Sequence, residues 1–274
     1  MNEKHPLLKY VREGAIRQPH CSGCGNGIIA QCMLRAIDEL QLDIDKIVFV
    51  SGIGCSSWIP SPFFNSDVLH TTHGRALAFA TGVKLGNPEL LTVVFTGDGD
   101  GAGIGGNHLI HAARRNIEIL TILVNNRIYG MTGGQVAPTT PHGMKTRTTP
   151  YGNIENPFDI CRLVEVAGAS YVARWTTFHV KQLVLSMKKG LLKEGFALIE
   201  VVSHCPVQYG KYIGARDPVE LLLMLKNLSV QMGEAKSMTA KELEERIVVG
   251  EFVDKKEKVG LAKAYKGLLD EVEA

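Results

Sequence analysis

Two short polar motifs, each placed directly after an apolar run, constrain the fold of this chain more than any other feature. Gly97-Asp98-Gly99 follows the run 91–96, and after 25 further residues Asn125-Asn126 closes the run that begins at Ile117. Short apolar, partly β-branched runs bounded by turn residues are typical of strands buried on both faces. A helix is predicted between them, over 104–115, so the order strand, loop, helix, strand predicts a right-handed parallel crossover.

The crossover brings the polar residues of both motifs to one edge of the sheet. Because parallel strands end at the same edge, the Asp98 carboxylate and the Asn126 side-chain oxygen are expected to converge. The glycines allow the backbone to approach a phosphate, and the helix that follows offers free N–H groups at its first turn. Gly-Asp-Gly alone is usually a turn, but the paired spacing favours a site for a metal-bound diphosphate.

Length and composition exclude several classes of protein. With 274 residues, the chain is long enough for one sizeable α/β domain, alone or with an appendage. Thirty basic and 28 acidic residues, without a long run of one sign, give no indication of a nucleic-acid or membrane partner. No apolar run approaches the roughly 18 residues of a membrane span, and residues 1–6 lack the core of a signal peptide, so a cytoplasmic location is predicted.

Helices and strands are predicted to alternate along the chain, giving an α/β fold with a mostly parallel sheet flanked by helices. Beyond the central unit, the pattern predicts an irregular leader over 1–20, strands over 47–50 and 197–202, a helix that is opened by 21–25 and stops near 41, and helices over 74–85, 158–167 and 177–194. A long polar segment, 127–156, interrupts the alternation and is expected to be functional or disordered. Residues 1–209 are predicted to form the main domain, and 210–274 a helical C-terminal extension with a capping box at Thr239 and Glu242.

Four of the six cysteines are predicted to meet beside the diphosphate site. Cys21 and Cys24 form a C-x2-C pair, which by itself suits a redox motif, a zinc site or an iron-sulfur cluster. Cys55 and Cys205 each follow a predicted strand, so parallel strands would bring both to the edge that carries Asp98. A zinc ion that ties the chain together is the alternative to a redox cluster for this set.

The other two cysteines have a simpler interpretation. Cys32 and Cys161 fall on apolar faces of predicted helices and are expected to be ordinary buried thiols. In a cytoplasmic protein a disulfide framework is not expected.

The spacing of the two opening motifs resembles the thiamine diphosphate motif of thiamine-dependent enzymes. That resemblance implies that Asp98, Asn126 and the backbone carbonyl of Ile128 hold Mg²⁺, which prefers octahedral oxygen ligands.

Further motifs extend the resemblance to the β subunits of 2-oxoacid:ferredoxin oxidoreductases, over about residues 19–210. The matching pieces are Cys-Ser-Gly-Cys-Gly at 21–25, Gly-Ile-Gly-Cys-Ser at 52–56, His-Gly-Arg-Ala at 73–76, Thr-Gly-Gly-Gln at 132–135 and His-Cys-Pro at 204–206. The family implies that Cys21, Cys24, Cys55 and Cys205 hold a [4Fe-4S] cluster. The residues it implies around thiamine diphosphate are Ile53, Gly54, Cys55, Ser56, His73, Gly97, Gly99, Asp100, Gly130 and Met131.

Three residues are candidates for substrate contacts. Thr132 and Gln135 can offer hydrogen bonds to a carboxylate or carbonyl, although this segment is also compatible with a plain tight turn. Relatives that accept charged or broad 2-oxoacids often carry Lys or Arg where this chain has Trp58, yet the region around Cys205 to Gly210 is similar to the 2-oxoglutarate type. We favour 2-oxoglutarate, with pyruvate, branched-chain or aryl 2-oxoacids as rivals, and place the missing cation on a partner subunit.

The family implies coenzyme A-dependent, reversible oxidative decarboxylation of a 2-oxoacid to acyl-CoA and CO₂, with electrons passed through the cluster to ferredoxin. The Glu that touches the pyrimidine ring of the cofactor would come from an α subunit, because no second cofactor-binding domain fits in this length; γ and δ subunits are also compatible with the family. No catalytic residue is therefore assigned within this chain. A non-redox thiamine diphosphate-dependent decarboxylase or synthase would leave the cysteines unexplained, and a non-enzymatic cluster scaffold would leave the diphosphate spacing unexplained.

Overall fold

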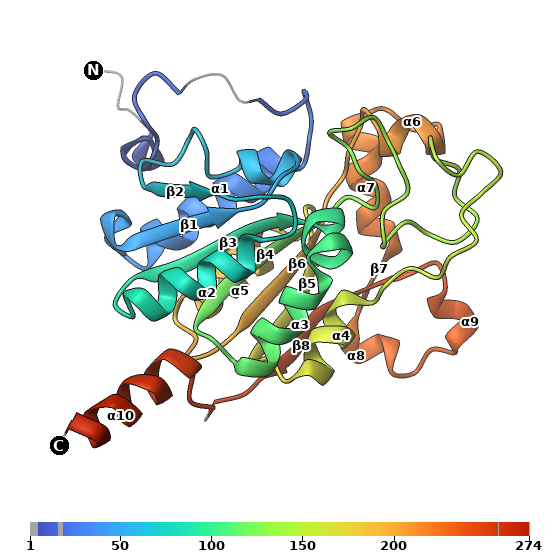
Figure 1. Ribbon diagram of the computed structural model, residues 1–274. Helices are drawn as coiled ribbons and strands as arrows, with labels where there is room; N and C mark the ends of the chain where they lie inside the picture. The colour runs from blue at the N-terminus through green and yellow to red at the C-terminus, as the bar shows by residue number, and fades with distance from the viewer. Residues whose placement is uncertain (1–4, 16–18, 257, 274) are drawn as a thin grey trace.

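An eight-stranded sheet runs through the protein in the order β2-β1-β3-β4-β6-β5-β8-β7 (Figure 1). The computed structural model describes residues 5–15, 19–256 and 258–273. The strands are β1 (Ile47–Ser51), β2 (Asp67–His70), β3 (Leu91–Gly97), β4 (Ile119–Asn125), β5 (Tyr171–Thr176), β6 (Ala197–Val202), β7 (Ser229–Gln231) and β8 (Ile247–Asp254). Every pair from β2 to β5 is parallel, whereas β8 runs antiparallel to β5.

Helices cover both faces of this sheet, as the alternating sequence pattern predicts. One face carries α1 (Asn26–Glu39) and α5 (Val180–Leu191); the other carries α2 (Ala76–Gly86), α3 (Gly106–Arg115) and α4 (Ile160–Ala167) (Figure 1). The two faces enclose separate apolar cores. Ile29, Met33 and Ile37, at helical spacing on α1, pack in the first core, while Leu109 and Val164 pack in the second. Covering both faces explains why the central strands are apolar throughout.

The predicted α/β class and its parallel central unit are confirmed, while β2 and β5 of the parallel part of the sheet were not anticipated. β2 is four residues long and largely exposed, so it lacks the apolar run of a buried strand. β5 contains Arg174, a charge that interrupts its apolar run. The predicted leader contains a short 3-10 helix at Pro6–Tyr10, and its residues 1–4 and 16–18 lie outside the described residues.

The C-terminal residues contain the helices that the sequence predicts and, in addition, two strands. They form α6 (Tyr209–Ile213), α7 (Pro218–Leu228), α8 (Met232–Ala235), α9 (Ala240–Leu243) and α10 (Leu261–Glu273), but also β7 and β8. β8 joins the main sheet beside β5, and Leu225, Ile247 and Val249 belong to its core. The capping box at Thr239 and Glu242 is present, on α9. The division near residue 210 stays a prediction, and α10 projects from the body (Figure 1).

The polar segment 127–156 is ordered by its own hydrogen bonds rather than by helices or strands. Tyr129 and Gln135 form an isolated antiparallel bridge, and the Asn153 amide donates to the Thr140 carbonyl at 2.9 Å. The Thr140 hydroxyl in turn donates to the Arg127 carbonyl at 2.7 Å. The segment therefore has a fixed shape beside the carboxyl ends of the strands, as a functional loop requires.

The helices of the described residues include no membrane span. None of them is both long enough and apolar enough to cross a bilayer.

Candidate active site

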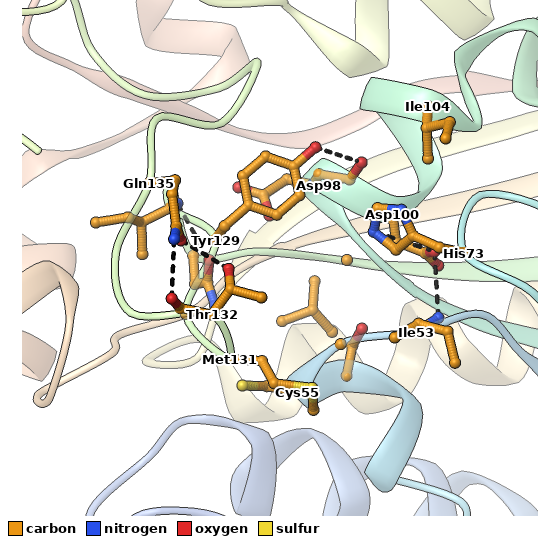
Figure 2. A pocket seen from close by; sticks show the side chains of 18 of the residues that line it. Ile53, Cys55, His73, Asp98, Asp100, Ile104, Tyr129, Met131, Thr132 and Gln135 are labelled. Carbon is orange, nitrogen blue, oxygen red and sulfur yellow. Dashed lines mark hydrogen bonds and ion pairs between the residues drawn. The ribbon is translucent and has the colours of Figure 1, made fainter. Parts of the chain in front are cut away.

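The carboxyl ends of β1, β3, β4 and β6 meet at one edge of the sheet, where a cavity of about 850 Å³ opens (Figure 2). Its lining consists of Ile53, Gly54, Cys55, Ser56, His73, Gly97, Asp98, Gly99, Asp100, Ile104, Val124, Asn126, Ile128, Tyr129, Gly130, Met131, Thr132, Gln135, Val136 and Thr148. All ten residues predicted to contact the cofactor lie on this wall, together with the three predicted Mg²⁺ ligands. Parallel pairing therefore produces the convergence that the motif spacing predicts.

Asp98 lies at the end of β3 and is almost completely buried. One carboxylate oxygen accepts a hydrogen bond from the Gly99 amide at 2.9 Å, and the other accepts from the Thr139 hydroxyl at 2.6 Å. Burial raises the pKa of Asp98 to about 6, because within the described chain no Lys or Arg pairs with it. A buried carboxylate without a cation of its own is suited to hold a metal ion.

Asn126 and Ile128 are positioned by a left-handed turn at Arg127, whose φ is 62°. The side-chain oxygen of Asn125 accepts from the Arg127 amide at 3.1 Å, and that of Asn126 accepts from the Ile128 amide at 3.2 Å. These two Asx bonds stabilise a backbone conformation that non-glycine residues rarely adopt. The turn places the Asn126 side chain and the Ile128 residue on the cavity wall beside Asp98.

A buried charged group supports this turn from beneath. The Asn125 amide donates to the Glu200 carboxylate on β6 at 2.7 Å, and Glu200 is 1 % exposed. Arg174 on β5 donates to the same carboxylate at 2.8 Å, and the Cys161 thiol lies 3.2 Å from it. Cys161 is therefore a buried thiol, as predicted, but it contacts a charged network. Cys32 is also buried, in the first core.

Asp100 connects three loops at the other end of the cavity. One of its carboxylate oxygens accepts from the Gly74 amide at 2.6 Å and from the Ile53 amide at 3.2 Å, and the other accepts from the Thr96 hydroxyl at 2.6 Å. The His73 ring lies 3.7 Å from the same carboxylate. Asp100 thus holds the loop after β1 and the loop before α2 against the turn at 98–104 (Figure 2).

Tyr129 and Thr139 belong to the site although the sequence did not single them out. The Tyr129 hydroxyl donates to the Gly99 carbonyl at 3.0 Å, and a side chain at Gly99 would clash with the Tyr129 ring. Gly99 is thus required for a close approach between the two motif loops. Tyr129 and Thr139 both lie in the segment 127–156. The sequence indicated a functional loop there only through the lack of hydrophobic periodicity.

Two of the four cysteines implied by the family, Cys55 and Cys205, lie beside Gly130. A Cβ at Gly130 would lie 3.6 Å from the Cys55 sulfur and 3.9 Å from the Cys205 sulfur. Burial, with smaller contributions from Cys205, Cys55 and Cys21, raises the pKa of Cys24 to about 12, so the four thiols are electrostatic neighbours.

These sulfurs are not grouped tightly. Among the described residues, no three Cys, His, Asp or Glu side chains approach closely enough to share one metal ion.

Two of the three candidate substrate residues line the cavity, and the third does not. Thr132 and Gln135 lie on its wall, where the Thr132 hydroxyl donates to the Gln135 side chain at 2.6 Å (Figure 2). Trp58 is not part of the lining, and its ring lies beside that of His70 with 6.1 Å between centroids. Their contacts with a substrate stay predictions.

Known proteins that are similar to this chain match it over most of its length, and their descriptions agree with one another. The family model described as "Thiamine pyrophosphate enzyme, C-terminal TPP binding domain" matches residues 52–201. The 2-oxoglutarate synthase subunit KorB of Methanocaldococcus jannaschii is 56% identical over 250 residues, covering 91% of this chain and 92% of that protein. A 2-oxoacid:ferredoxin oxidoreductase subunit beta from Sulfolobus is 44% identical over 188 residues, covering 68% of this chain and 61% of that protein.

A solved structure agrees with these sequences. The 2-oxoglutarate:ferredoxin oxidoreductase from Magnetococcus marinus, with 2-oxoglutarate, coenzyme A and succinyl-CoA bound, superposes with a TM-score of 0.86 at 34% identity. The superposition covers 99% of this chain and 92% of that chain. The likeness therefore includes the C-terminal strands and helices as well as the cavity.

Proposed function

Since the chain belongs to the β subunits of 2-oxoacid:ferredoxin oxidoreductases, we propose that it works with a partner subunit on 2-oxoglutarate. The overall reaction converts 2-oxoglutarate and coenzyme A into succinyl-CoA and CO₂, and it is reversible. Two electrons leave the substrate one at a time and reduce two ferredoxins. The observation that carries this proposal is the surroundings of Gly130, where an added Cβ would lie 3.5 Å from the Asn126 amide nitrogen, 3.6 Å from the Cys55 sulfur and 3.9 Å from the Cys205 sulfur.

The donor set of the cavity fits a metal-bound diphosphate. Asp98, Asn126 and the Ile128 carbonyl would hold Mg²⁺, and the buried Asp98 carboxylate would gain the cation that it otherwise lacks. Thiamine diphosphate, when bound, serves as the electron sink for decarboxylation. Gly97 and Gly99 lie on the cavity wall where the diphosphate would bind, while Asp100 fixes the loops that carry Ile53 and His73.

The cysteines fit a [4Fe-4S] cluster better than a zinc ion. Zinc would hold four thiolates at about 2.3 Å, and among the described residues no three Cys, His, Asp or Glu side chains are placed to hold one ion. Beside the ligands, His20 Nε2 and Ser203 Oγ are buried and have no hydrogen-bond partner in the described chain. Sulfur atoms of a cluster can accept such bonds. Cys21, Cys24, Cys55 and Cys205 would therefore hold the cluster, which provides the one-electron route out of the site.

The site needs a partner to complete it. No glutamate lines the cavity within the described residues, and the carboxylate of Asp100 is already occupied by three donors. Ile53, Ile104 and Met131 line the cavity yet are 46%, 54% and 48% exposed. An α subunit that covers this apolar rim would exclude water and supply the missing glutamate. Further γ and δ subunits, and a cytoplasmic location, are compatible with this arrangement.

The proposal is tested on the complex purified with its partner. We expect ferredoxin reduction that depends on 2-oxoglutarate and coenzyme A, together with bound iron and thiamine diphosphate in the same preparation. Cys21→Ser should lose the brown iron-sulfur absorbance, and Asp98→Ala should lose Mg²⁺-dependent cofactor retention. A colourless zinc protein, or activity that needs no electron acceptor, would reject the redox assignment in favour of a zinc site or a non-redox decarboxylase.

A further inference from the structure

The cavity lacks a cation for the second carboxylate of a dicarboxylic substrate. Its lining within the described residues contains Asp98, Asp100 and His73 as titratable side chains other than Cys and Tyr, but no Lys or Arg. His73 faces Asp100 at the right of Figure 2, while Thr132 and Gln135 lie at the opposite side. An acidic substrate tail directed toward that opposite side therefore needs a cation from beyond the immediate wall.

Arg147 lies at that side. Its amide donates to the Gly134 carbonyl at 2.9 Å, and its guanidinium packs over Gly133, where a Cβ would lie 2.9 Å from Nη1. Gly133 and Gly134 are the central residues of the turn that carries Thr132 and Gln135. The φ of Gly133 is 104°, so glycine is needed both for this backbone conformation and for the approach of the guanidinium.

The backbone around Arg147 is fixed while its charge is free. Thr148, the next residue, lines the cavity and accepts a hydrogen bond from the Val136 amide at 3.0 Å. The Thr146 and Thr149 hydroxyls are 2.7 Å apart and close the loop on both sides. Arg147 itself is exposed and has no carboxylate within ion-pair distance among the described residues. An anchored arginine without an acidic partner is suited to bind a carboxylate ligand.

Two other cations near this loop contact aromatic side chains. Arg127 lies 3.5 Å from the Tyr209 hydroxyl, and Lys211 lies over the Tyr212 ring at 5.4 Å.

We propose that Arg147 is the specificity-determining residue that binds the distal carboxylate of the 2-oxoacid. This inference rests on the proposed function and moves the missing cation from the partner to this chain. In 2-oxoglutarate the second carboxylate lies three carbon-carbon bonds beyond the 2-oxo carbon, so a substrate that reacts in the cavity extends toward its wall. Arg147 forms charge-assisted hydrogen bonds with that group and none with a 2-oxoacid that ends in a methyl group.

The test compares Arg147→Met in the assembled complex with 2-oxoglutarate and with 2-oxobutyrate, which lacks the distal carboxylate. We expect kcat/KM for 2-oxoglutarate to fall about 10- to 100-fold, the range for a lost hydrogen bond to a charged group, with 2-oxobutyrate unchanged. Arg147→Lys should restore part of the loss. Lys145→Met, which removes a neighbouring exposed charge, is the matched control and should leave both substrates unchanged.

The outcomes separate the two proposals. Equal losses with both substrates would show a structural role for Arg147, and no loss with either would show no role; each overturns this inference and leaves the proposed function in place. A wild-type complex that turns over 2-oxobutyrate but not 2-oxoglutarate overturns the substrate assignment, and the inference with it.

Discussion

Asp98 and Asp100 are two residues apart, but their surroundings give them opposite roles. Asp100 has three donors from the chain itself, so its carboxylate stabilises the fold of the loops. Asp98 has two donors and a pKa that burial raises to about 6, so its charge is unfavourable until a cation binds. A metal ligand of this kind lowers the stability of the metal-free protein and increases the affinity of the protein for the metal ion.

Asp98→Asn should therefore stabilise the metal-free protein while it weakens Mg²⁺ binding. The folded pKa of Asp98 lies above its unfolded value of 3.8, so wild-type stability falls as pH rises from about 4 through 6. Above that window we expect the variant to be more stable by about 1 to 3 kcal/mol, and below pH 4 the difference should vanish. Urea unfolding in EDTA at pH 4, 6 and 8 measures this.

Asp100→Asn is the matched control, because it perturbs an acceptor that the folded loops use. It should be less stable than wild type at pH 8. An Asp98→Asn protein less stable than wild type at pH 8 would contradict the argument.

At the scale of elements, the central strands do more than place loops at one edge. β5 and β6 carry Arg174 and Glu200 side by side, both largely buried, and the pair supports the turn after β4 through Asn125. A charged pair in a sheet core is rarely a net gain in stability, but breaking it is costly because one charge stays buried.

Glu200→Ala should destabilise the protein by about 3 to 5 kcal/mol, since the half-exposed Asp159 is then the one ion-pair partner left to Arg174 among the described residues. The double variant Glu200→Leu with Arg174→Met should recover most of that loss, because it removes both charges. Urea unfolding curves of the wild type, the Glu200→Ala variant and the double variant give the three free energies of unfolding that test this.

If the double variant recovers stability but not Mg²⁺ affinity, Glu200 also positions Asn125. A Glu200→Ala protein within 0.5 kcal/mol of wild type would mean that the pair is not a structural element of the sheet.

At the scale of the whole molecule, exposed apolar side chains are found at both ends of the parallel strands. Ile53, Ile104 and Met131 surround the cavity, whereas Leu192 lies at the start of the strands, beside Leu91 and Ile119. Only Ile53, Ile104 and Met131 adjoin the cavity, for which we propose that a partner subunit supplies the missing glutamate. We therefore propose that the partner binds at that edge.

Ile104→Glu should prevent association with the partner subunit and leave the folded chain intact. A charge on this 54% exposed side chain costs little in the free subunit but is buried when the rim is covered. Co-purification without added cofactor, together with the thermal midpoint of the isolated subunit, checks both parts. Leu192→Glu, at a 62% exposed position on the opposite edge, is the control and should assemble normally; assembly of both variants would place the partner elsewhere.

Local sequence patterns were sufficient to predict the central parallel unit and the set of residues at its edge. Strand runs and turn motifs are local, and parallel pairing carries residues after each strand to a common place, so Asp98, Asn126, Cys55 and Cys205 could be grouped without coordinates. The same reasoning did not predict β5, because Arg174 interrupts the apolar pattern of that strand. The ion-pair partner of Arg174 is Glu200, which is 26 residues away in the sequence.

Only the tertiary structure decided how the loops fit together. The contact of Tyr129 with Gly99 and that of Thr139 with Asp98 join segments 30 and 41 residues apart, and no local pattern encodes them. The inclusion of β8 in the sheet likewise depends on pairing with β5 across 80 residues. Hydrophobic period and turn chemistry act over a few residues, whereas these contacts depend on shape and hydrogen-bond complementarity between distant surfaces. The paired Gly-Asp-Gly and Asn-Asn motifs thus specify where the site lies, and the packed loops specify its geometry.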